Sequence, residues 1–128
     1  MDDLYRDEIL EHYRNPHNFG TLSEPDVTLE GSNPLCGDRM TLSLKFAGGK
    51  VSDVAFTGRG CAISQASASM LTDEIKGRPI SEVDALTNQD VLDNLGIEIS
   101  PARLKCALLS IDTLHKALAA APTSKVSA

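Results

Sequence analysis

The chain has 128 residues, of which 41% are hydrophobic and 23% charged, and its formal net charge at pH 7 is −6. This length favours a single domain, residues 1–128, built on one core. The acidic balance argues against binding to a phosphate backbone, so we expect no nucleic-acid partner. The sequence contains no apolar run of about 18 residues and starts with the acidic, amphipathic stretch MDDLYRDEILEHY, so we predict a cytoplasmic protein without a membrane span or secretory signal.

The first predicted element is a short helix. Asp2 and Asp3 can cap it, apolar side chains recur at helical spacing up to Tyr13, and Pro16 ends it. Most of its sides are polar, so it offers little surface to a core. Farther along, an apolar-alternating piece at residues 27–30 predicts an edge strand.

A β-hairpin is the clearest pattern in the sequence. Apolar and polar residues alternate over residues 40–46, and a second run over residues 51–57 places Val54 and Phe56 on one side. Residues 48–49, both Gly, can take the positive φ angles that a two-residue turn requires.

This turn predicts a register that bears on two cysteines. A two-residue turn pairs Ala47 with Lys50, and continuing the same register places Cys36 opposite Cys61. Directly opposed residues have Cβ atoms about 4.5–5.5 Å apart, which is compatible with two ligands on one metal. Several glycines nearby would loosen the ladder, so we predict proximity of the two thiols and not a strict pair.

The remaining elements are predicted to be helices. One follows Cys61, with an apolar stripe over residues 63–75 and Gly77 as a stop signal, and its many Ala and Ser residues would let it lie close against the sheet. Two short helices are predicted over residues 81–86 and 87–95.

The last long helix is predicted to start at Ser100-Pro101, an N-cap followed by Pro in the first turn. Its apolar stripe comprises Leu104, Leu108, Ile111, Leu114 and Leu118. The residues after Pro122 are interpreted as a tail. Together these elements predict an α+β fold, in which a small antiparallel three-stranded sheet is packed on one face by helices.

The three cysteines have surroundings that favour chemistry over packing. An odd number of cysteines without an export signal indicates reduced thiols. Cys36 lies in a turn that exposes its thiol, and Cys61 lies at a helix start, where backbone N–H groups favour a thiolate. Cys106 lies in the first turns of the last helix, beside Arg103 and Lys105, which can offset negative charge.

A carboxylate completes this candidate site. Asp38, two residues after Cys36, supplies an oxygen, and three thiolates with one carboxylate would form a tetrahedral zinc site. The spacing of the cysteines matches no compact zinc-finger pattern. A zinc ion that only holds the fold together is therefore one alternative, and a metal or sulfur-handling site is the other.

Four motifs identify a family resemblance. They are HYRNP with NFG (residues 12–20), NPLCGD (33–38), GCAISQASAS (60–69) and RLKC (103–106). With these motifs in this order, the chain resembles the IscU/SufU/NifU N-terminal family of iron–sulfur cluster assembly proteins. The resemblance implies an α/β sandwich in which Cys36, Asp38, Cys61 and Cys106 converge as metal ligands.

The branches of that family differ at a few positions. SufU-like proteins have Lys immediately before the third Cys, where IscU-like scaffolds have His, and this chain has Lys105. It lacks the insertion that SufU-like proteins usually carry between the second and third Cys. Residues 99–103 also depart from the Leu-Pro-Pro-Val-Lys motif by which chaperones recognise the scaffolds.

Two functions are therefore expected from the resemblance. In the first, the zinc-bound protein accepts persulfide sulfur from a cysteine desulfurase of the SufS/IscS type on Cys36, with Arg103 and Lys105 assisting, and passes it to downstream iron–sulfur assembly or acceptor proteins. If the chain is an enzyme at all, it is then a persulfide sulfurtransferase-like accessory protein. In the second, it is a scaffold for a transient [2Fe–2S] cluster, and Cys106 is the sulfur acceptor.

Some polar residues are given simpler interpretations. His12, His17 and His115 lie far from the cysteine motifs in the sequence, and we interpret them as surface or packing residues. The Ser-rich run at residues 64–69 is interpreted as a device for tight helix packing.

Overall fold

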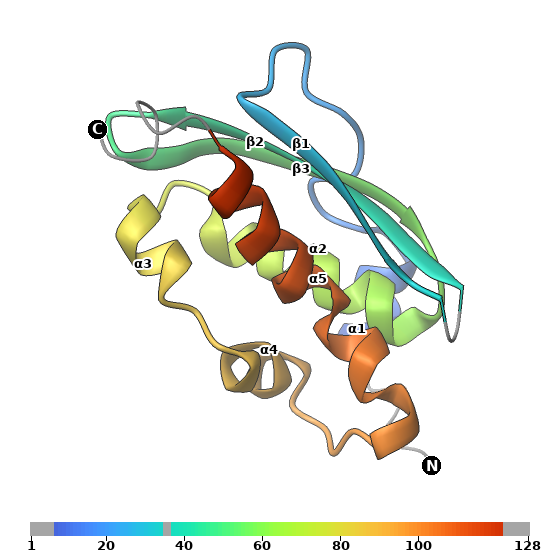
Figure 1. The fold of residues 1–128 in the computed structure, drawn as a ribbon. Helices are drawn as coiled ribbons and strands as arrows, with labels where there is room; N and C mark the ends of the chain where they lie inside the picture. The colour runs from blue at the N-terminus through green and yellow to red at the C-terminus, as the bar shows by residue number, and fades with distance from the viewer. Residues whose placement is uncertain (1–6, 35–36, 122–128) are drawn as a thin grey trace.

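The chain forms a three-stranded antiparallel sheet with helices packed against one face, as predicted (Figure 1). This computed structural model describes residues 7–34 and 37–121. The elements, in chain order, are α1 (Asp7–Arg14), β1 (Val27–Asn33), β2 (Asp38–Ala47), β3 (Lys50–Arg59), α2 (Ala62–Ile75), α3 (Ile80–Asp84), α4 (Asn88–Leu95) and α5 (Pro101–Ala120).

The sheet is a meander of order β1-β2-β3, and its central turn is the predicted one. Gly48 and Gly49 have φ angles of 59° and 76°, so both occupy the left-handed region that only glycine adopts at little cost. Ala47 pairs with Lys50 across this turn. The two-residue turn predicted from the Gly48-Gly49 pair is therefore correct.

A β-bulge interrupts the hairpin a few residues from the turn. The register shifts by one residue after Lys45, which leaves Ser52 as an extra residue on β3 whose hydroxyl donates to the Lys45 carbonyl at 3.1 Å. Without the bulge, strict alternation would point Val51 to the face opposite Val54 and Phe56. With it, all three side chains are buried in the core.

The bulge shifts the rest of the ladder by one position from the register that the turn alone gives. From Lys45 back to Arg39, away from the turn, each β2 residue pairs one position farther along β3 than the turn alone predicts, and the described ladder ends at Arg39 and Arg59. Continued beyond the ladder, this register places Gly37, and not Cys36, opposite Cys61. Cys36 itself lies outside the described residues.

The outer edge of β3 is covered by the loop that follows α1. Phe56 N–H donates to the Asn18 carbonyl at 2.9 Å, and Gly20 N–H donates to the Phe56 carbonyl at 2.8 Å. The rings of Phe19 and Phe56 meet edge to face with centroids 5.4 Å apart. This segment therefore satisfies backbone groups that an open edge would offer to another chain.

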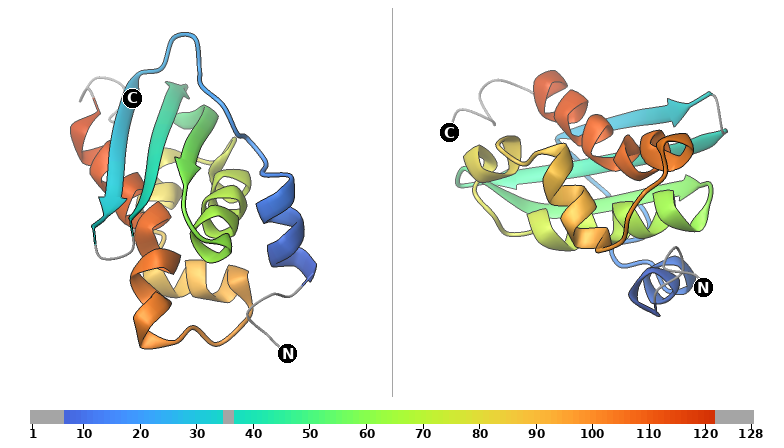
Figure 2. Two further views of the ribbon diagram at one scale, coloured as in Figure 1. Left: turned by 90° about the vertical axis from the view of Figure 1, so that its right-hand side faces the viewer. Right: turned by 90° about the horizontal axis from the view of Figure 1, so that it is seen from below.

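Helices α2 and α5 form the layer on the sheet, and α1 lies on the far side of α2 from α5 (Figure 2). The Ser67 hydroxyl donates to the Ala107 carbonyl at 2.7 Å and lies 2.8 Å from the Ser110 hydroxyl. This contact confirms that small residues in α2 allow close helix packing. None of the described helices is both long and apolar enough to cross a bilayer.

Helix α1 is attached by one fully buried apolar side chain. Ile9 is 0% exposed and packs in a small cluster with Ile63, Ala66, Leu95 and Ala107. The predicted caps Asp2 and Asp3 lie outside the described residues, as does the stretch interpreted as a C-terminal tail.

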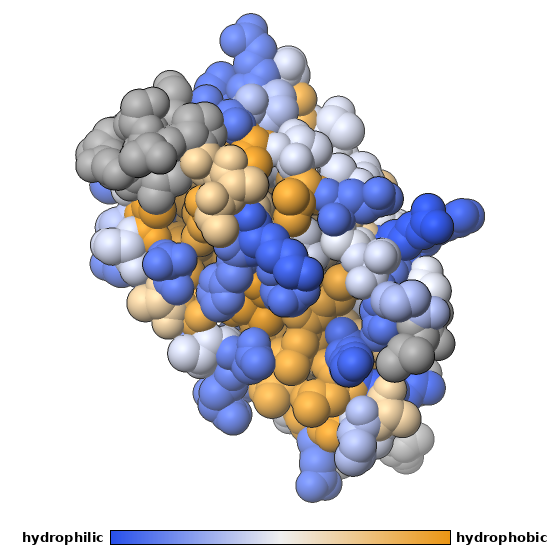
Figure 3. All heavy atoms as spheres, viewed as in Figure 1, coloured by the Kyte–Doolittle hydropathy of each residue, from blue (hydrophilic) through white to orange (hydrophobic). Residues whose placement is uncertain are grey.

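The prediction that Leu104 belongs to the apolar stripe of α5 is wrong. Leu104 is 36% exposed, whereas Cys106, two positions later, is 4% exposed. Leu104 borders a surface hollow with Leu92 and Ile97, and Figure 3 shows apolar side chains gathered over this region between α4 and α5. The buried face at the start of α5 is therefore rotated toward Cys106.

Candidate metal centre

Three of the four predicted ligands come together at one end of the molecule. Asp38 is the first residue of β2, Cys61 is the N-cap of α2, and Cys106 lies in the second turn of α5. One ligand atom from each, a carboxylate oxygen or a sulfur, lies within 4.8 Å of the other two. Residues far apart in the sequence thus form a cluster of the size that one metal ion requires.

Asp38 is held in place by the start of α2. The Cys61 N–H donates to Asp38 Oδ1 at 3.3 Å, and Cys61 Sγ lies 3.8 Å from Asp38 Oδ2. Only 3% of Asp38 is exposed, so its carboxylate is oriented inside the fold and is not a mobile surface group. Cys61 has extended backbone angles, and the helix begins with Gln65 N–H donating to its carbonyl.

Cys106 reaches the same cluster because the first turns of α5 lie over the start of α2. Its neighbour Ala107 is fully buried and packs with Ile63, two residues after Cys61. This side of α5 is therefore buried against the fold, and Cys106 on it is only 4% exposed. Cys106 thus lies in the same cluster as Asp38 and Cys61.

Cys36 lies outside the described residues, but the residues on both sides of it are placed. Gly37 has a φ angle of 76°, and its N–H donates to the Asn33 carbonyl at 2.8 Å. Gly37 also lines the cavity beside the cluster. Gly37, the described residue that follows Cys36 in the sequence, therefore borders the candidate site.

An open cavity of about 670 Å³ adjoins the cluster. Arg59 and Arg103 line it together with Asp38 and the two described cysteines. Lys105 lines a different hollow of about 400 Å³ with Asn33 and Pro34. Of the two predicted cations, Arg103 is thus the one at the cavity, and the roles of both stay predictions.

Arg59 is a residue that the sequence reasoning missed. It ends β3 two residues before Cys61, so its place next to the GC motif was the available signal. Three thiolates and one carboxylate around a divalent ion leave a formal charge of about −2. Two arginines on the cavity wall offset such a charge.

The donor set fits zinc. Thiolate sulfur and carboxylate oxygen are both zinc ligands, at about 2.3 Å and about 2.0–2.2 Å from the ion. The described donors already lie close together, and small shifts would bring them to these distances. Thiolates are equally the ligands of iron–sulfur clusters, so the same donors fit a [2Fe–2S] cluster.

The chain is similar to known proteins over almost its whole length. Residues 4–127 match the model of the NifU-like N-terminal domain. The chain is 39% identical to the zinc-dependent sulfurtransferase SufU of Bacillus subtilis, with 93% of this chain and 92% of that protein covered. It is 40% identical to the iron–sulfur cluster assembly enzyme IscU of Drosophila melanogaster, with 91% and 77% covered.

A solved structure has the same fold. The N-terminal part of a nitrogen-fixing NifU-like protein from Brucella abortus superposes with a TM-score of 0.77 at 26% identity, and 98% of this chain and 96% of that chain are covered. Sequence and fold therefore agree, and the chain belongs to the NifU-like N-terminal domain family.

Proposed function

We propose that this chain acts in iron–sulfur cluster assembly as a zinc-dependent acceptor of sulfur from a cysteine desulfurase. The observation that carries the proposal is the convergence of Asp38, Cys61 and Cys106 within 4.8 Å, next to a cavity lined by Gly37, which follows the third cysteine in the sequence. A relative that covers nearly the whole chain is named a zinc-dependent sulfurtransferase. Cys36, Asp38, Cys61 and Cys106 are the proposed ligands.

The proposed transfer needs no oxidant or reductant. The Cys36 thiolate attacks the terminal sulfur of the desulfurase persulfide, and a new S–S bond forms at Cys36. The S–S bond of the donor breaks, and its electron pair leaves on the desulfurase thiolate. Bound zinc would hold the thiols deprotonated and in position. Arg59 and Arg103 on the cavity wall would attract the anionic persulfide.

The test is to find where the sulfur goes. The zinc-loaded chain is incubated with a cysteine desulfurase and cysteine, alkylated without reductant, digested and analysed by mass spectrometry. A persulfide on Cys36 is expected, and its absence from all three cysteines would contradict the proposal. The Cys36→Ser variant is the control. If it stays folded but accepts no sulfur, the cysteine acts in transfer and not only in holding the fold together.

A scaffold for a [2Fe–2S] cluster is the second candidate function. It is favoured by the carboxylate in the donor set, because an oxygen ligand on iron makes a cluster easier to release, and by the 40% identical relative named an iron–sulfur cluster assembly enzyme. In this case sulfur is expected on Cys106. Anaerobic reconstitution should give a cluster that activates an apo-acceptor protein, and an acceptor that gains no activity would exclude this function.

A further inference from the structure

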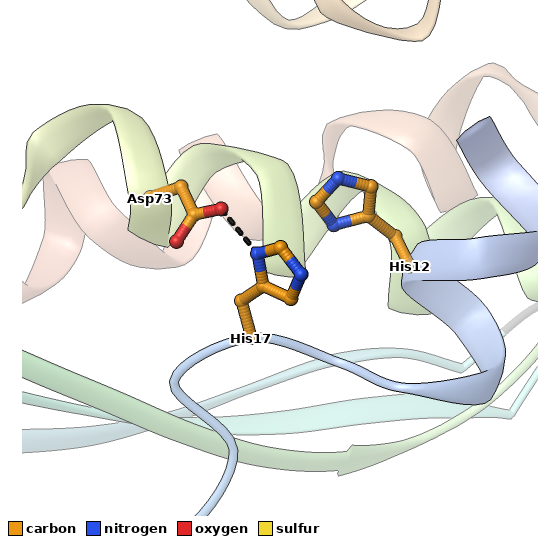
Figure 4. A group of neighbouring side chains, drawn as sticks. All are labelled: His12, His17 and Asp73. Carbon is orange, nitrogen blue, oxygen red and sulfur yellow. Dashed lines mark hydrogen bonds and ion pairs between the residues drawn. The ribbon is translucent and has the colours of Figure 1, made fainter.

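A second group of metal-ligand side chains lies on the other side of α2 from α5. His12 comes from α1, His17 from the loop after it, and Asp73 from the last turns of α2, and the two imidazoles and the carboxylate point toward one another (Figure 4). One ligand atom from each lies within 4.8 Å of the other two. The ring centroids of the two histidines are 4.5 Å apart. Interpreting these histidines separately, as surface or packing residues, missed this contact.

Neighbouring polar groups hold the side chains of His12 and Asp73 and the backbone of His17. Ser69 Oγ lies 2.6 Å from His12 Nδ1, and it accepts a hydrogen bond from the backbone N–H of His17 at 2.8 Å. Asn18 donates to Asp73 Oδ1 at 3.0 Å, while Asp73 Oδ2 pairs with His17 Nδ1. Hydrogen bonds of this kind orient imidazole and carboxylate ligands around metal ions and fix the histidine tautomer.

The group is open to solvent, and two further carboxylates line the cavity beside it, of which Glu74 is paired with Arg78 at 3.3 Å. The side chains of His17 and Asp73 are each 46% exposed. A cavity of about 340 Å³ reaches His12 and Asp73 and is also lined by Glu8 and Glu74. A cation can therefore enter from solvent, be attracted by nearby carboxylates, and keep water in its remaining coordination positions.

We propose that His12, His17 and Asp73 bind a divalent first-row transition-metal ion, at a site separate from the cysteines. Two imidazoles and a carboxylate suit ions such as Zn²⁺ and Fe²⁺, whereas Mg²⁺ and Ca²⁺ prefer oxygen ligands. A metal ion bound at His17 Nδ1 would take the place of the hydrogen between this nitrogen and Asp73, and the imidazole would carry its proton on Nε2.

This ion would fasten α1 to the rest of the fold. The described part of α1 has eight residues, and a helix of that length is marginal in water without tertiary contacts. Ile9 is its one fully buried side chain in the described part of the chain. An ion bound by His12 on α1 and by Asp73 on α2 would add a direct link between the two helices. Slower hydrogen exchange of the α1 amides is the expected consequence.

The test is a zinc titration of the full chain, stripped with a chelator, kept reduced, and labelled for imidazole ¹⁵N NMR. Zn²⁺ is expected to shift the ring nitrogens of His12 and His17, to leave His115 unchanged, and to slow exchange in α1. Mg²⁺ at the same concentration is expected to cause none of these changes. Because the readout is the histidine rings, the result does not depend on whether the cysteines bind zinc.

Variants make the assignment specific. His17→Gln and, in a second protein, Asp73→Asn are expected to lose one of two zinc equivalents and to retain the thiolate-to-metal absorption of Co²⁺ at the cysteines. His115→Gln is the matched control, since His115 bonds to the Leu86 carbonyl elsewhere in the fold, and it is expected to keep both equivalents. Unshifted His12 and His17 resonances at saturating Zn²⁺, or unchanged zinc binding in both variants, would overturn the proposal.

Discussion

Gly60 lies so close to Asp38 that a Cβ atom at position 60 would come within 2.5 Å of Asp38 Oδ1 and 2.6 Å of Ser64 Oγ. Real Cβ atoms do not approach other atoms so closely, so a side chain here would displace the carboxylate or the start of α2. The glycine before Cys61 is therefore required by the packing of the proposed ligand Asp38.

Gly60→Ala is accordingly expected to weaken zinc binding at the cysteines by at least about tenfold, the lower end of the effect of misplacing a ligand through its supporting contacts. Competition with a chromophoric chelator measures this affinity. Ala102→Ser is the control, because Ala102 lines the same cavity and is exposed. Equal zinc affinity in Gly60→Ala and wild type would show that Asp38 is not held as described.

The two cations predicted from the sequence are expected to differ in effect. Arg103 lines the cysteine cavity and Lys105 lines another hollow. Arg103→Gln, or Arg59→Gln, is expected to slow persulfide transfer by up to about fivefold, because a partly exposed charge contributes about 1 kcal/mol or less. Initial rates of transfer at several salt concentrations test this. A larger effect of Lys105→Gln would contradict the assignment.

The bulge at Ser52 provides a test of the fold. Deletion of Ser52 removes the extra residue and leaves Val51, Val54 and Phe56 on one face of an unbroken strand, so little change in stability is expected. Deletion of Ala55 instead makes Val54 and Phe56 neighbours that point to opposite faces, and the expected loss in free energy of unfolding is about 1.5–3 kcal/mol for the apolar side chain that becomes exposed. Urea denaturation measures both variants, and equal losses in the two would contradict the role of the bulge.

The sequence predicted the elements with strong local signals and missed features that depend on tertiary contacts. The alternation over β2 and β3 and the Gly48-Gly49 pair define the hairpin by themselves. The bulge has no such signal, because Ser52 is an ordinary strand residue and only the need to bury Val51 together with Phe56 reveals it.

For the cysteine site and the histidine group too, local motifs could be recognised in the sequence, whereas contacts between helices could not. Asp38, Cys61 and Cys106 were identified through motifs, and their convergence with Cys36 was expected from the family resemblance. The inward turn of Cys106 with Leu104 exposed depends on how α5 packs on α2. The contact of His12 and His17 with Asp73 depends on the docking of α1. Neither packing arrangement can be read from a local pattern.

His12 makes the stability of the metal-free protein depend on pH. Burial lowers the pKa of His12 below its ordinary value of 6.5, and the neighbouring His17 has a second, smaller effect in the same direction. The carboxylates of Asp73, Glu11 and Glu8 act in the opposite direction. The unfolded chain therefore takes up this proton at a higher pH than the folded protein does. The stability that His12 contributes is complete above pH 6.5 and is lost as the pH falls below it.

Thermal unfolding in the presence of a chelator, between pH 8 and pH 5, measures this dependence. His12→Gln is expected to reduce the fall in melting temperature across that range, and His115→Gln is expected to leave it unchanged. An identical fall in wild type and His12→Gln would show that other groups cause the pH dependence.

The most direct test of the cysteine centre is X-ray absorption at the zinc edge, on the His17→Gln protein loaded with one equivalent of zinc. If the ion is bound by all four proposed ligands, we expect three sulfur neighbours at about 2.3 Å and one oxygen at about 2.0–2.2 Å, from Cys36, Cys61, Cys106 and Asp38. A zinc ion with fewer than three sulfur neighbours would contradict the proposal that this fold gathers all three thiols around one metal ion.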